Sequence, residues 1–404
     1  MPDRHESPLR ILIPLGLGTC LSLFGDSSLY AVLPTHTDSA GVSIATVGIL
    51  LSVNRFIRLV LNGPAGVAYD RYSRRRLYVL ALFIGALSTG IYALSRGFWP
   101  LFVGRLLWGL AWSGIWIGGN AIVAEVSHHG TRGRWVGLYH GFYYLGAAAG
   151  AFIGSLLTDA VGYHRAMGVS AGLTLLGAFI ALLYLPEIEG RASVASDCAA
   201  DRPQSVLHLR PPVVVAFALY GVTRLVVPGV LNSTFGLLLE NEVGAQIEIA
   251  GRSIGVATLT GSGLGLATLI AMASSPALGA LSDRTPNRWG VVATGVAAGV
   301  TGFSLLTIAT PWSIIVGIPL AALASGSNQS LSIAVIGDLS RPGEQSKRLG
   351  MLFTLGDLGS AVGPLLAYAL VPALGVRGNY LLSAGVLGVM LLAALWLARR
   401  APEA

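Results

Sequence analysis

Six ionisable side chains stand in the middle of long apolar stretches of this 404-residue chain: Asp26, Arg55, Arg58, Arg105, Arg224 and Asp357. A charge at such a place costs roughly 2.5–3.5 kcal/mol on membrane-insertion scales, so it needs a partner or a water-filled cavity. A carboxylate beside an arginine titrates when that contact is disturbed. The two acids are therefore candidate proton sites, and the four arginines are candidate binding groups.

Asp26 is the first candidate for a proton site. Counted from the outer ends of their apolar stretches, Asp26 and Arg105 lie at similar depth, which predicts an ion pair. A permanent structural salt bridge is the alternative interpretation of the pair. Asp357 is either a second proton site or a partner of Arg224, with helix capping or polar packing as the alternative.

Arg55 and Arg58 share one helix face with Asn62, because residues three and four apart are neighbours on a helix surface. That face must point into the protein, since lipid does not solvate guanidinium groups. If Asp26 satisfies Arg105 and Asp357 satisfies Arg224, these two arginines have no acid in the membrane. We therefore expect them either to bind an anionic substrate or to bond helix carbonyls.

An aromatic stripe follows Arg105 along the same helix, with tryptophans spaced by four. It comprises Trp108, Trp112 and Trp116, and Tyr30, Tyr139, Tyr143 and Tyr144 could extend it. A cavity wall for a flat substrate and ordinary bundle packing are both consistent with this stripe. His140 is expected at a surface or packing position. The polar residues expected to face a cavity in the second half are Asn232, Asn328 and Gln329.

Composition predicts a membrane protein. Only 11% of residues are charged and 53% are apolar, whereas soluble domains average about 25% charged. Apolar runs of about 20 residues span a bilayer as helices. Twelve such runs are present: Ile11–Pro34, Ile44–Gly66, Leu77–Leu94, Phe98–Ala124, Val136–Leu157, Met167–Leu185, Val213–Leu239, Ile254–Leu278, Val291–Ala309, Trp312–Ile336, Leu349–Val371 and Tyr380–Leu397.

The chain repeats itself after 213 residues. Gly66, Asp70, Arg71 and Arg75 recur as Gly279, Asp283, Arg284 and Arg288, and Glu125 recurs as Asp338. Two equal apolar halves are the signature of a transporter built from an internal repeat. We expect a six-helix bundle at residues 1–186, a polar linker at 187–211 and a second six-helix bundle at 212–404.

The distribution of basic residues predicts the orientation. With both termini and the even-numbered loops on one side, that side holds eighteen Lys and Arg and the other four. Positive loops face the cytoplasm, so both termini are expected there, in the cytoplasmic (inner) membrane. The net charge of +7 is thereby explained without a nucleic-acid partner. No Cys/His cluster or P-loop is present in the sequence, so no metal, cofactor or ATP is expected.

Three motifs carry a family resemblance. They are the loop Gly66-x-x-x-Asp70-Arg71-Tyr72-Ser73-Arg74-Arg75, the segment Leu101-x-x-x-Arg105-x-x-Trp108-Gly109 and the glycines 137, 146, 150 and 154. All three resemble signatures of the major facilitator superfamily, in its twelve-helix drug and metabolite efflux branch. The loop has Ser73 where a glycine is usual, and the third motif has Ala151 in place of its usual proline. The resemblance implies that Asp70 caps the eleventh helix.

The charge clusters at this loop and its repeat are expected to gate the cytoplasmic side. Arg71 is predicted to pair with Glu125, and Arg284 with Asp338 at the same spacing, latching the outward-facing state; the arginines could instead only set topology. The predicted function is alternating-access transport, as proton-coupled efflux of small amphipathic molecules by a monomer in the lipid bilayer. The alternatives are transport of an anionic metabolite by uniport, symport or exchange, and a non-transporting membrane sensor.

Overall fold

A computed structural model describes residues 8–127, 131–187, 211–249, 251–285, 287–340 and 345–400. The first half of the chain forms long helices, because in lipid an apolar segment satisfies its backbone hydrogen bonds within itself only as a helix. The elements are α1 (Pro8–Val32), the short α2 (Thr37–Ala40), α3 (Ile44–Arg71), α4 (Arg74–Leu94), α5 (Phe98–Val126), α6 (Arg132–Val161) and α7 (Tyr163–Tyr184).

The second half repeats this arrangement with two irregularities near its start. Its elements are α8 (Pro211–Arg224), the π-helical η1 (Leu225–Leu231), α9 (Asn232–Val243), β1 (Gln246–Ile249), β2 (Arg252–Gly255), α10 (Val256–Arg284), α11 (Arg288–Ile308), α12 (Pro311–Leu339) and α13 (Gln345–Arg400). The first three run on without a break and form one span, Pro211–Val243. The strands form an antiparallel hairpin, with Gln246 opposite Gly255.

The last helix, α13, contains two spans. It is 56 residues long and is broken at Gly375, where φ is 66°, a conformation that favours glycine. At 1.5 Å per residue it would measure about 84 Å, far more than the roughly 30 Å hydrocarbon core of a bilayer. With its two parts counted separately, the eleven helices long and apolar enough to cross a membrane supply twelve spans in the described residues.

The predicted fold class, an all-α membrane protein with twelve spans in two halves, is therefore confirmed. The one departure is the β1–β2 hairpin, which the apolar pattern did not reveal because it lies in a polar connection. Most of the expected linker at 187–211 lies outside the described residues.

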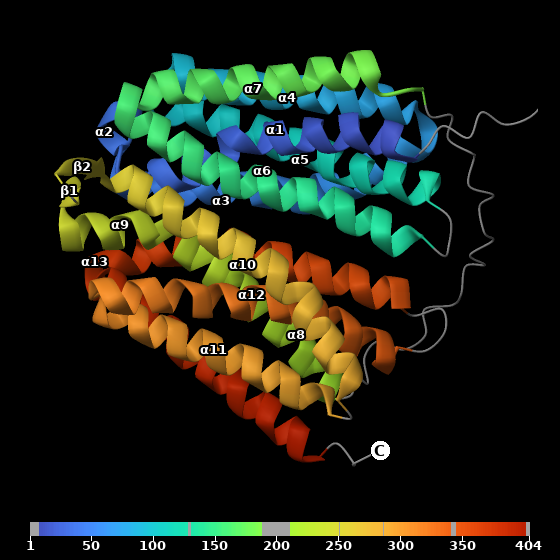
Figure 1. Cartoon of the computed structure of the whole chain (residues 1–404), viewed down its shortest axis with the longest axis vertical. Helices are drawn as coiled ribbons and strands as arrows, with labels where there is room; N and C mark the ends of the chain where they lie inside the picture. The colour runs from blue at the N-terminus through green and yellow to red at the C-terminus, as the bar shows by residue number, and fades with distance from the viewer. Residues whose placement is uncertain are drawn as a thin grey trace, which may run out of the picture.

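The helices form two bundles that meet along two helix pairs. In Figure 1 the blue-to-green helices α1–α7 lie together above the yellow-to-red helices α8–α13. Within the first bundle α1 packs on α6 and α7, and α4 on α5 and α7. Across the halves, α3 packs along α13 and α6 along α10. Any side chain that joins the halves therefore has to come mainly from these four helices.

Close packing within each half depends on glycine. A Cβ added at Gly146 of α6 would lie 2.4 Å from the carbonyl oxygen of Cys20 in α1, and one at Gly363 of α13 would lie 2.5 Å from the Cα of Gly229. Small residues let membrane helices approach to backbone contact and gain dispersion energy. Of the glycines that the sequence flagged in α6, Gly146, Gly150 and Gly154 therefore serve the α1–α6 contact, and Gly137 does not.

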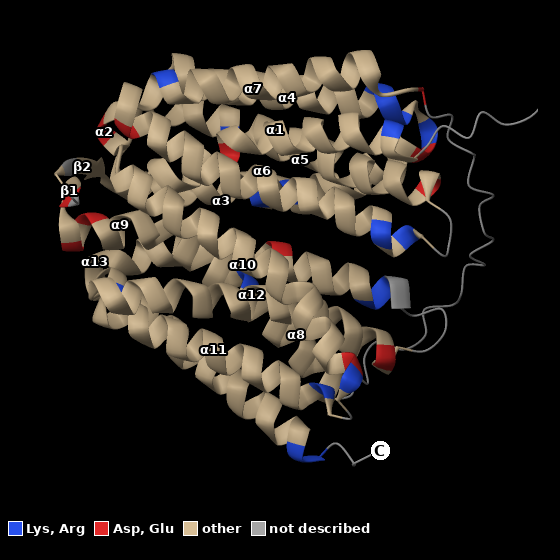
Figure 2. Cartoon of the chain, viewed as in Figure 1, with Lys and Arg blue, Asp and Glu red and all other residues tan. Residues whose placement is uncertain are grey.

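The charged residues gather at the two ends of the bundle. Figure 2 shows most of the blue ribbon segments at the end where α3 ends and α4 begins. We call this end the basic face; the helix termini there carry Arg71, Arg74, Arg75, Arg76, Arg132, Arg134, Arg284, Arg288, Lys347, Arg348, Arg399 and Arg400. The opposite end, which carries α2 and the β1–β2 hairpin, is called the hairpin face.

Candidate functional site

Arg105 and Asp26 form an ion pair inside the first half, as their predicted depths implied. The Arg105 side chain is completely buried, and its Nη1 donates to a carboxylate oxygen of Asp26. Its Nε donates to the Leu50 carbonyl oxygen at 2.9 Å. Because α1 and α5 belong to the same bundle, this pair stabilises the first half internally.

Tyr30 lies between two arginines. The guanidinium carbons of Arg55 and Arg105 stand 5.1 and 5.3 Å from the centre of its ring, within the range of cation–π attraction. The Arg55 Nε also donates to the Tyr30 hydroxyl at 3.0 Å, and its Nη1 donates to the Ser360 carbonyl oxygen of α13 at 3.3 Å. Arg55 thus joins the two halves through neutral acceptors.

Asp357 pairs with Arg58, which corrects the expectation that its partner is Arg224. The Arg58 Nη2 lies 3.1 Å from one Asp357 oxygen and 3.2 Å from the other, and the Asn62 amide donates to the carboxylate at 3.5 Å. The two charged side chains are 16% and 15% exposed. The expectation failed because the sequence did not show that α3 lies directly against α13.

Arg224 is left without an acid within salt-bridge distance among the described residues. Its Nε is buried and makes no hydrogen bond. Its electrostatic neighbours are the phenols of Tyr220, Tyr143 and Tyr144, and Asp357. Arg224 is the last residue of α8, directly before the π-helical η1, a feature often found at functional sites.

The aromatic stripe changes character along α5. Trp108 and Trp112 are 1% and 6% exposed, so they pack the core of the first bundle. Trp116 is partly exposed; its ring stacks on Trp112 at 5.8 Å and on His140 at 5.1 Å, and lies 5.1 Å from Tyr143. The packing interpretation therefore applies at Trp108 and Trp112, whereas a cavity wall at the partly exposed Trp116 stays a prediction.

His140 occupies a packing position, one of the two expected from the sequence, whereas its partner Asn120 was not predicted. The His140 ring lies in the aromatic cluster and its Nε2 is 3.2 Å from the Asn120 amide oxygen. Their contact depends on which faces of α5 and α6 pack together, and the sequence does not show this. The spacing of four residues does, however, put His140 and Tyr144 on one helix face.

The three polar candidates of the second half differ in their surroundings. Asn328 is fully buried and donates to the Thr223 hydroxyl at 3.0 Å, so it ties α12 to α8. Gln329 accepts a hydrogen bond from the Tyr144 hydroxyl at 3.2 Å and thereby joins the halves. Asn232 is half-buried, and no hydrogen bond of its side chain is found within the described residues.

The charge clusters of the basic face use other arginines than predicted. Glu125 pairs with Arg74 in place of Arg71, and Asp338 pairs with Arg288 at 2.9 Å in place of Arg284. Each pair belongs to a single half, because α4 adjoins α5 and α11 adjoins α12. Arg288 also pairs with Asp283 at 3.0 Å, and Arg75 pairs with Glu187 at 3.0 Å.

The predicted cytoplasmic latch is not engaged in this conformation. Asp70 is exposed, and no cap onto α13 is found among the described residues. A Cβ added at Gly66 of α3, Gly137 of α6 or Gly350 of α13 would meet no atom within 4 Å. Between Asn62 and the basic face, no hydrogen bond or ion pair joins the two halves in the part of the chain that the structure describes.

The halves are instead joined at the hairpin face. Asp159, near the end of α6, accepts hydrogen bonds from the backbone N–H and the hydroxyl of Thr258, at 2.7 and 2.6 Å. Thr258 lies in the first turn of α10, where backbone N–H groups lack helical partners and the helix dipole favours an anion. Gly255 makes room, because a Cβ there would lie 2.2 Å from the Asp159 carboxyl carbon. Among the described residues, side-chain hydrogen bonds therefore hold the two halves together at the hairpin face and not at the basic face.

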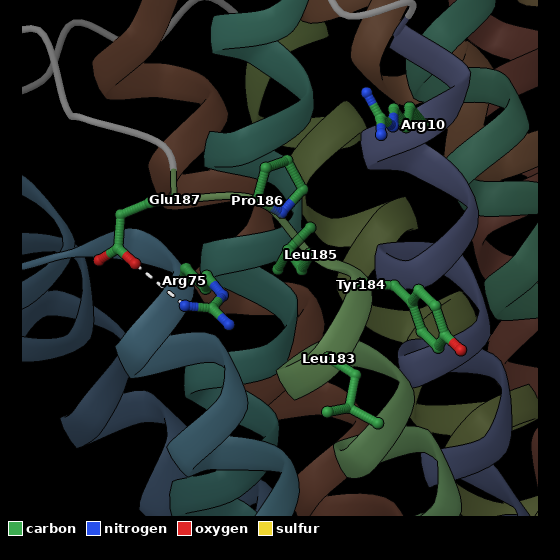
Figure 3. A pocket seen from close by; sticks show the side chains of 7 residues that line it. All are labelled: Arg10, Arg75, Leu183, Tyr184, Leu185, Pro186 and Glu187. Carbon is green, nitrogen blue, oxygen red and sulfur yellow. Dashed lines mark hydrogen bonds and ion pairs between the residues drawn. The ribbon is translucent and has the colours of Figure 1, made fainter.

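A pocket of about 340 Å³ opens at the basic face between α1, α4 and the end of α7. Figure 3 shows its lining, including the Arg75–Glu187 ion pair. Hydrogen bonds from Ser73 and Arg75 lower the pKa of the exposed Glu187 carboxyl. The lining contains none of the six buried charges, so this pocket is separate from the central site.

A bundle of twelve spans, with charges buried where its two halves meet, defines a membrane transporter. The sequence profile of the Major Facilitator Superfamily matches residues 15–268 and 213–404. The chain therefore belongs to this superfamily, as the three motifs predicted, and it is a multi-pass membrane protein.

By their names, similar proteins and solved structures are also transporters or resistance proteins. The chain is 26% identical to the class G tetracycline resistance protein of Vibrio anguillarum over 81% of this chain and 80% of that protein. It is 24% identical to the multidrug resistance protein MdtG of Escherichia coli over 95% and 94%. A bacterial homologue of the human lysosomal transporter Spinster, in an inward-facing and occupied conformation, superposes with a TM-score of 0.80 at 15% identity, covering 99% of this chain and 98% of that one.

Proposed function

We propose that this protein exports small amphipathic organic molecules from the cytoplasm in exchange for protons, as a monomer in the cytoplasmic membrane with both termini inside. The tetracycline and multidrug resistance proteins among its relatives support export. The positive-inside rule makes the basic face cytoplasmic. The conformation described above is then inward-facing, ready to take substrate from the cytoplasm.

The observation that carries the proposal is the ion pair between Arg58 and Asp357. It crosses from one half to the other near the middle of the bundle, and both side chains are partly exposed. Protonation of Asp357 removes the charge that holds Arg58, and this loosens α3 from α13. Release of the proton into the cytoplasm restores the pair and resets the inward-facing state.

Asp26 is the less favourable proton site, although its depth made it the first candidate. Its partner Arg105 is completely buried, so protonating Asp26 would leave a buried guanidinium without a counter-charge, at a cost of about 3–5 kcal/mol. The pair also lies within one half, where breaking it does not by itself release the other half. We therefore assign coupling to Asp357 and internal stabilisation to Asp26.

The test uses proteoliposomes with an imposed pH gradient and a fluorescent amphipathic cation such as ethidium. Asp357→Asn should abolish gradient-driven accumulation of ethidium while leaving its counterflow intact. Asp38→Asn, which removes an exposed acid at the hairpin face, serves as the matched control. Gradient-driven accumulation that survives in Asp357→Asn would remove Asp357 from coupling. Loss of it only in Asp26→Asn would return that role to Asp26.

A further inference from the structure

The central region carries an excess of positive charge. Asp26 neutralises Arg105 and Asp357 neutralises Arg58, whereas Arg55 and Arg224 have no acid within salt-bridge distance in the described residues. No other Asp or Glu stands in the middle of a described span. An arginine does not lose its proton in a protein, so two guanidinium charges persist there.

The two unpaired guanidinium groups are not equivalent. Arg55 donates from its Nε to the Tyr30 hydroxyl and from its Nη1 to the Ser360 carbonyl oxygen, both neutral acceptors. Arg224 keeps a buried Nε without any hydrogen bond. A buried donor left unpaired is costly, and an incoming acceptor that pairs with it recovers that cost.

Aromatic rings of the other half lie close to Arg224. Tyr144 donates to Gln329 at 3.2 Å, and Asn328, the residue before Gln329, donates to Thr223 next to Arg224 at 3.0 Å. Tyr143 and Tyr144 of α6 are among its electrostatic neighbours, and Tyr143 continues into the Trp116–His140 stack. These side chains are partly exposed although they lie eight or more residues inside their helices. Unlike an aliphatic wall, stacked rings favour a flat partner in offset or edge contact.

We propose that this transporter carries planar aromatic carboxylates, with the carboxylate on Arg224 and the ring against Tyr143 and Trp116. The inference rests on the proposed central transport site and narrows its substrate class. A guanidinium matches a carboxylate in shape and forms two parallel charge-assisted hydrogen bonds with it. The bound anion supplies the counter-charge that Arg224 lacks, and it links α8 of one half to α6 of the other.

The experiment compares matched probes on the purified full-length protein by titration calorimetry. The first two probes are 2-naphthoate (a planar anion) and 2-naphthamide (its neutral isostere). The second two are benzoate (a planar anion) and cyclohexanecarboxylate (an anion of similar size without a flat ring). We expect 2-naphthoate to bind about ten- to a hundredfold more tightly than 2-naphthamide, the factor for one charge-assisted contact. We expect benzoate to bind more tightly than cyclohexanecarboxylate. Equal affinity for 2-naphthoate and 2-naphthamide in the parent protein would overturn the proposal, without any variant having to fold.

Variants locate the contact. Arg224→Gln should weaken 2-naphthoate binding by the same factor and leave 2-naphthamide unchanged, and Arg224→Lys should retain part of the preference. Arg165→Gln, an exposed arginine of α7, is the control. Undiminished 2-naphthoate binding in Arg224→Gln would refute the assignment.

The ethidium assay separates the two proposals. Proton-driven ethidium transport without any preference for the naphthoate anion would leave export standing and remove the carboxylate class. Selective naphthoate binding without proton-driven transport of either compound would leave the carboxylate class standing and remove proton-coupled export.

Discussion

The contact of Asp159 with the first turn of α10 gives the most direct prediction about conformational balance. Asp159→Asn removes the negative charge that accepts two hydrogen bonds from Thr258, at 2.7 and 2.6 Å. Asparagine can still accept these hydrogen bonds through its amide oxygen, so the substitution removes only the charge. A charge at an exposed helix terminus is worth about 0.3–1 kcal/mol, and Asp159 is exposed.

A change of that size shifts the equilibrium between the closed and open hairpin face by about two- to fivefold. Ser155 is a suitable reporter, because it is completely buried in α6 and its hydroxyl makes no hydrogen bond. In a background without Cys20 and Cys198, Ser155→Cys should react with a membrane-impermeant maleimide only when the halves separate there. Its labelling rate should rise by the same factor in Asp159→Asn.

The control for this experiment is Glu248→Gln, which removes an exposed acid of the hairpin face that does not touch a helix terminus. Raising the ionic strength should shrink the difference between Asp159→Asn and its parent, since salt screens exposed charges. Equal labelling rates in Asp159→Asn and Glu248→Gln at low salt would refute the reasoning and leave the α6–α10 packing alone as the seal.

Two further predictions concern packing and pH. Gly146→Ala should lower the melting temperature of the purified protein, because the added Cβ would lie 2.4 Å from a carbonyl oxygen of α1. In the control Gly141→Ala the added Cβ would meet no atom within 4 Å. This variant should leave the melting temperature unchanged or raise it, since alanine stabilises a helix by about 1 kcal/mol relative to glycine. The pKa of Glu187 lies below its ordinary value of 4.5 because of hydrogen bonds from Ser73 and Arg75. The interaction of the Glu187 carboxylate with Ser73 and Arg75 is therefore fully present above pH 4.5, and it is lost as the pH falls through the lowered pKa. A spin label at position 186 should become more mobile over that range, and Glu187→Gln should abolish the dependence; a mobility that ignores pH in the parent protein would contradict this.

The sequence predicted the spans and the family well, because both depend on local pattern. Apolar runs mark helices whatever their neighbours are, and the repeat at 213 residues requires no knowledge of packing. The pairing of Asp26 with Arg105 was also within reach, since depth along two helices of the same half can be counted from their ends.

Partners across the interface were not predictable in the same way. The choice of Arg58 over Arg224 for Asp357 depends on which helix of one half adjoins α13, and a single sequence does not record this. The same holds at the basic face, where Arg74 replaces Arg71 as the partner of Glu125. Arg71 ends α3 whereas Arg74 begins α4, so the position of the helix boundary between them decides which arginine reaches Glu125.

The π-helical segment η1 fixes the rotational phase of the seventh span. A π turn contains one residue more than an α turn, and one residue corresponds to about 100° of rotation. Arg224 stands before this segment. Gly236 stands after it and packs near Thr35 of the other half. Both residues therefore face their neighbours only while the extra residue is present. Removing one residue between Leu225 and Leu231 would rotate the part of the span that carries Arg224 by about 100° relative to the part that carries Gly236.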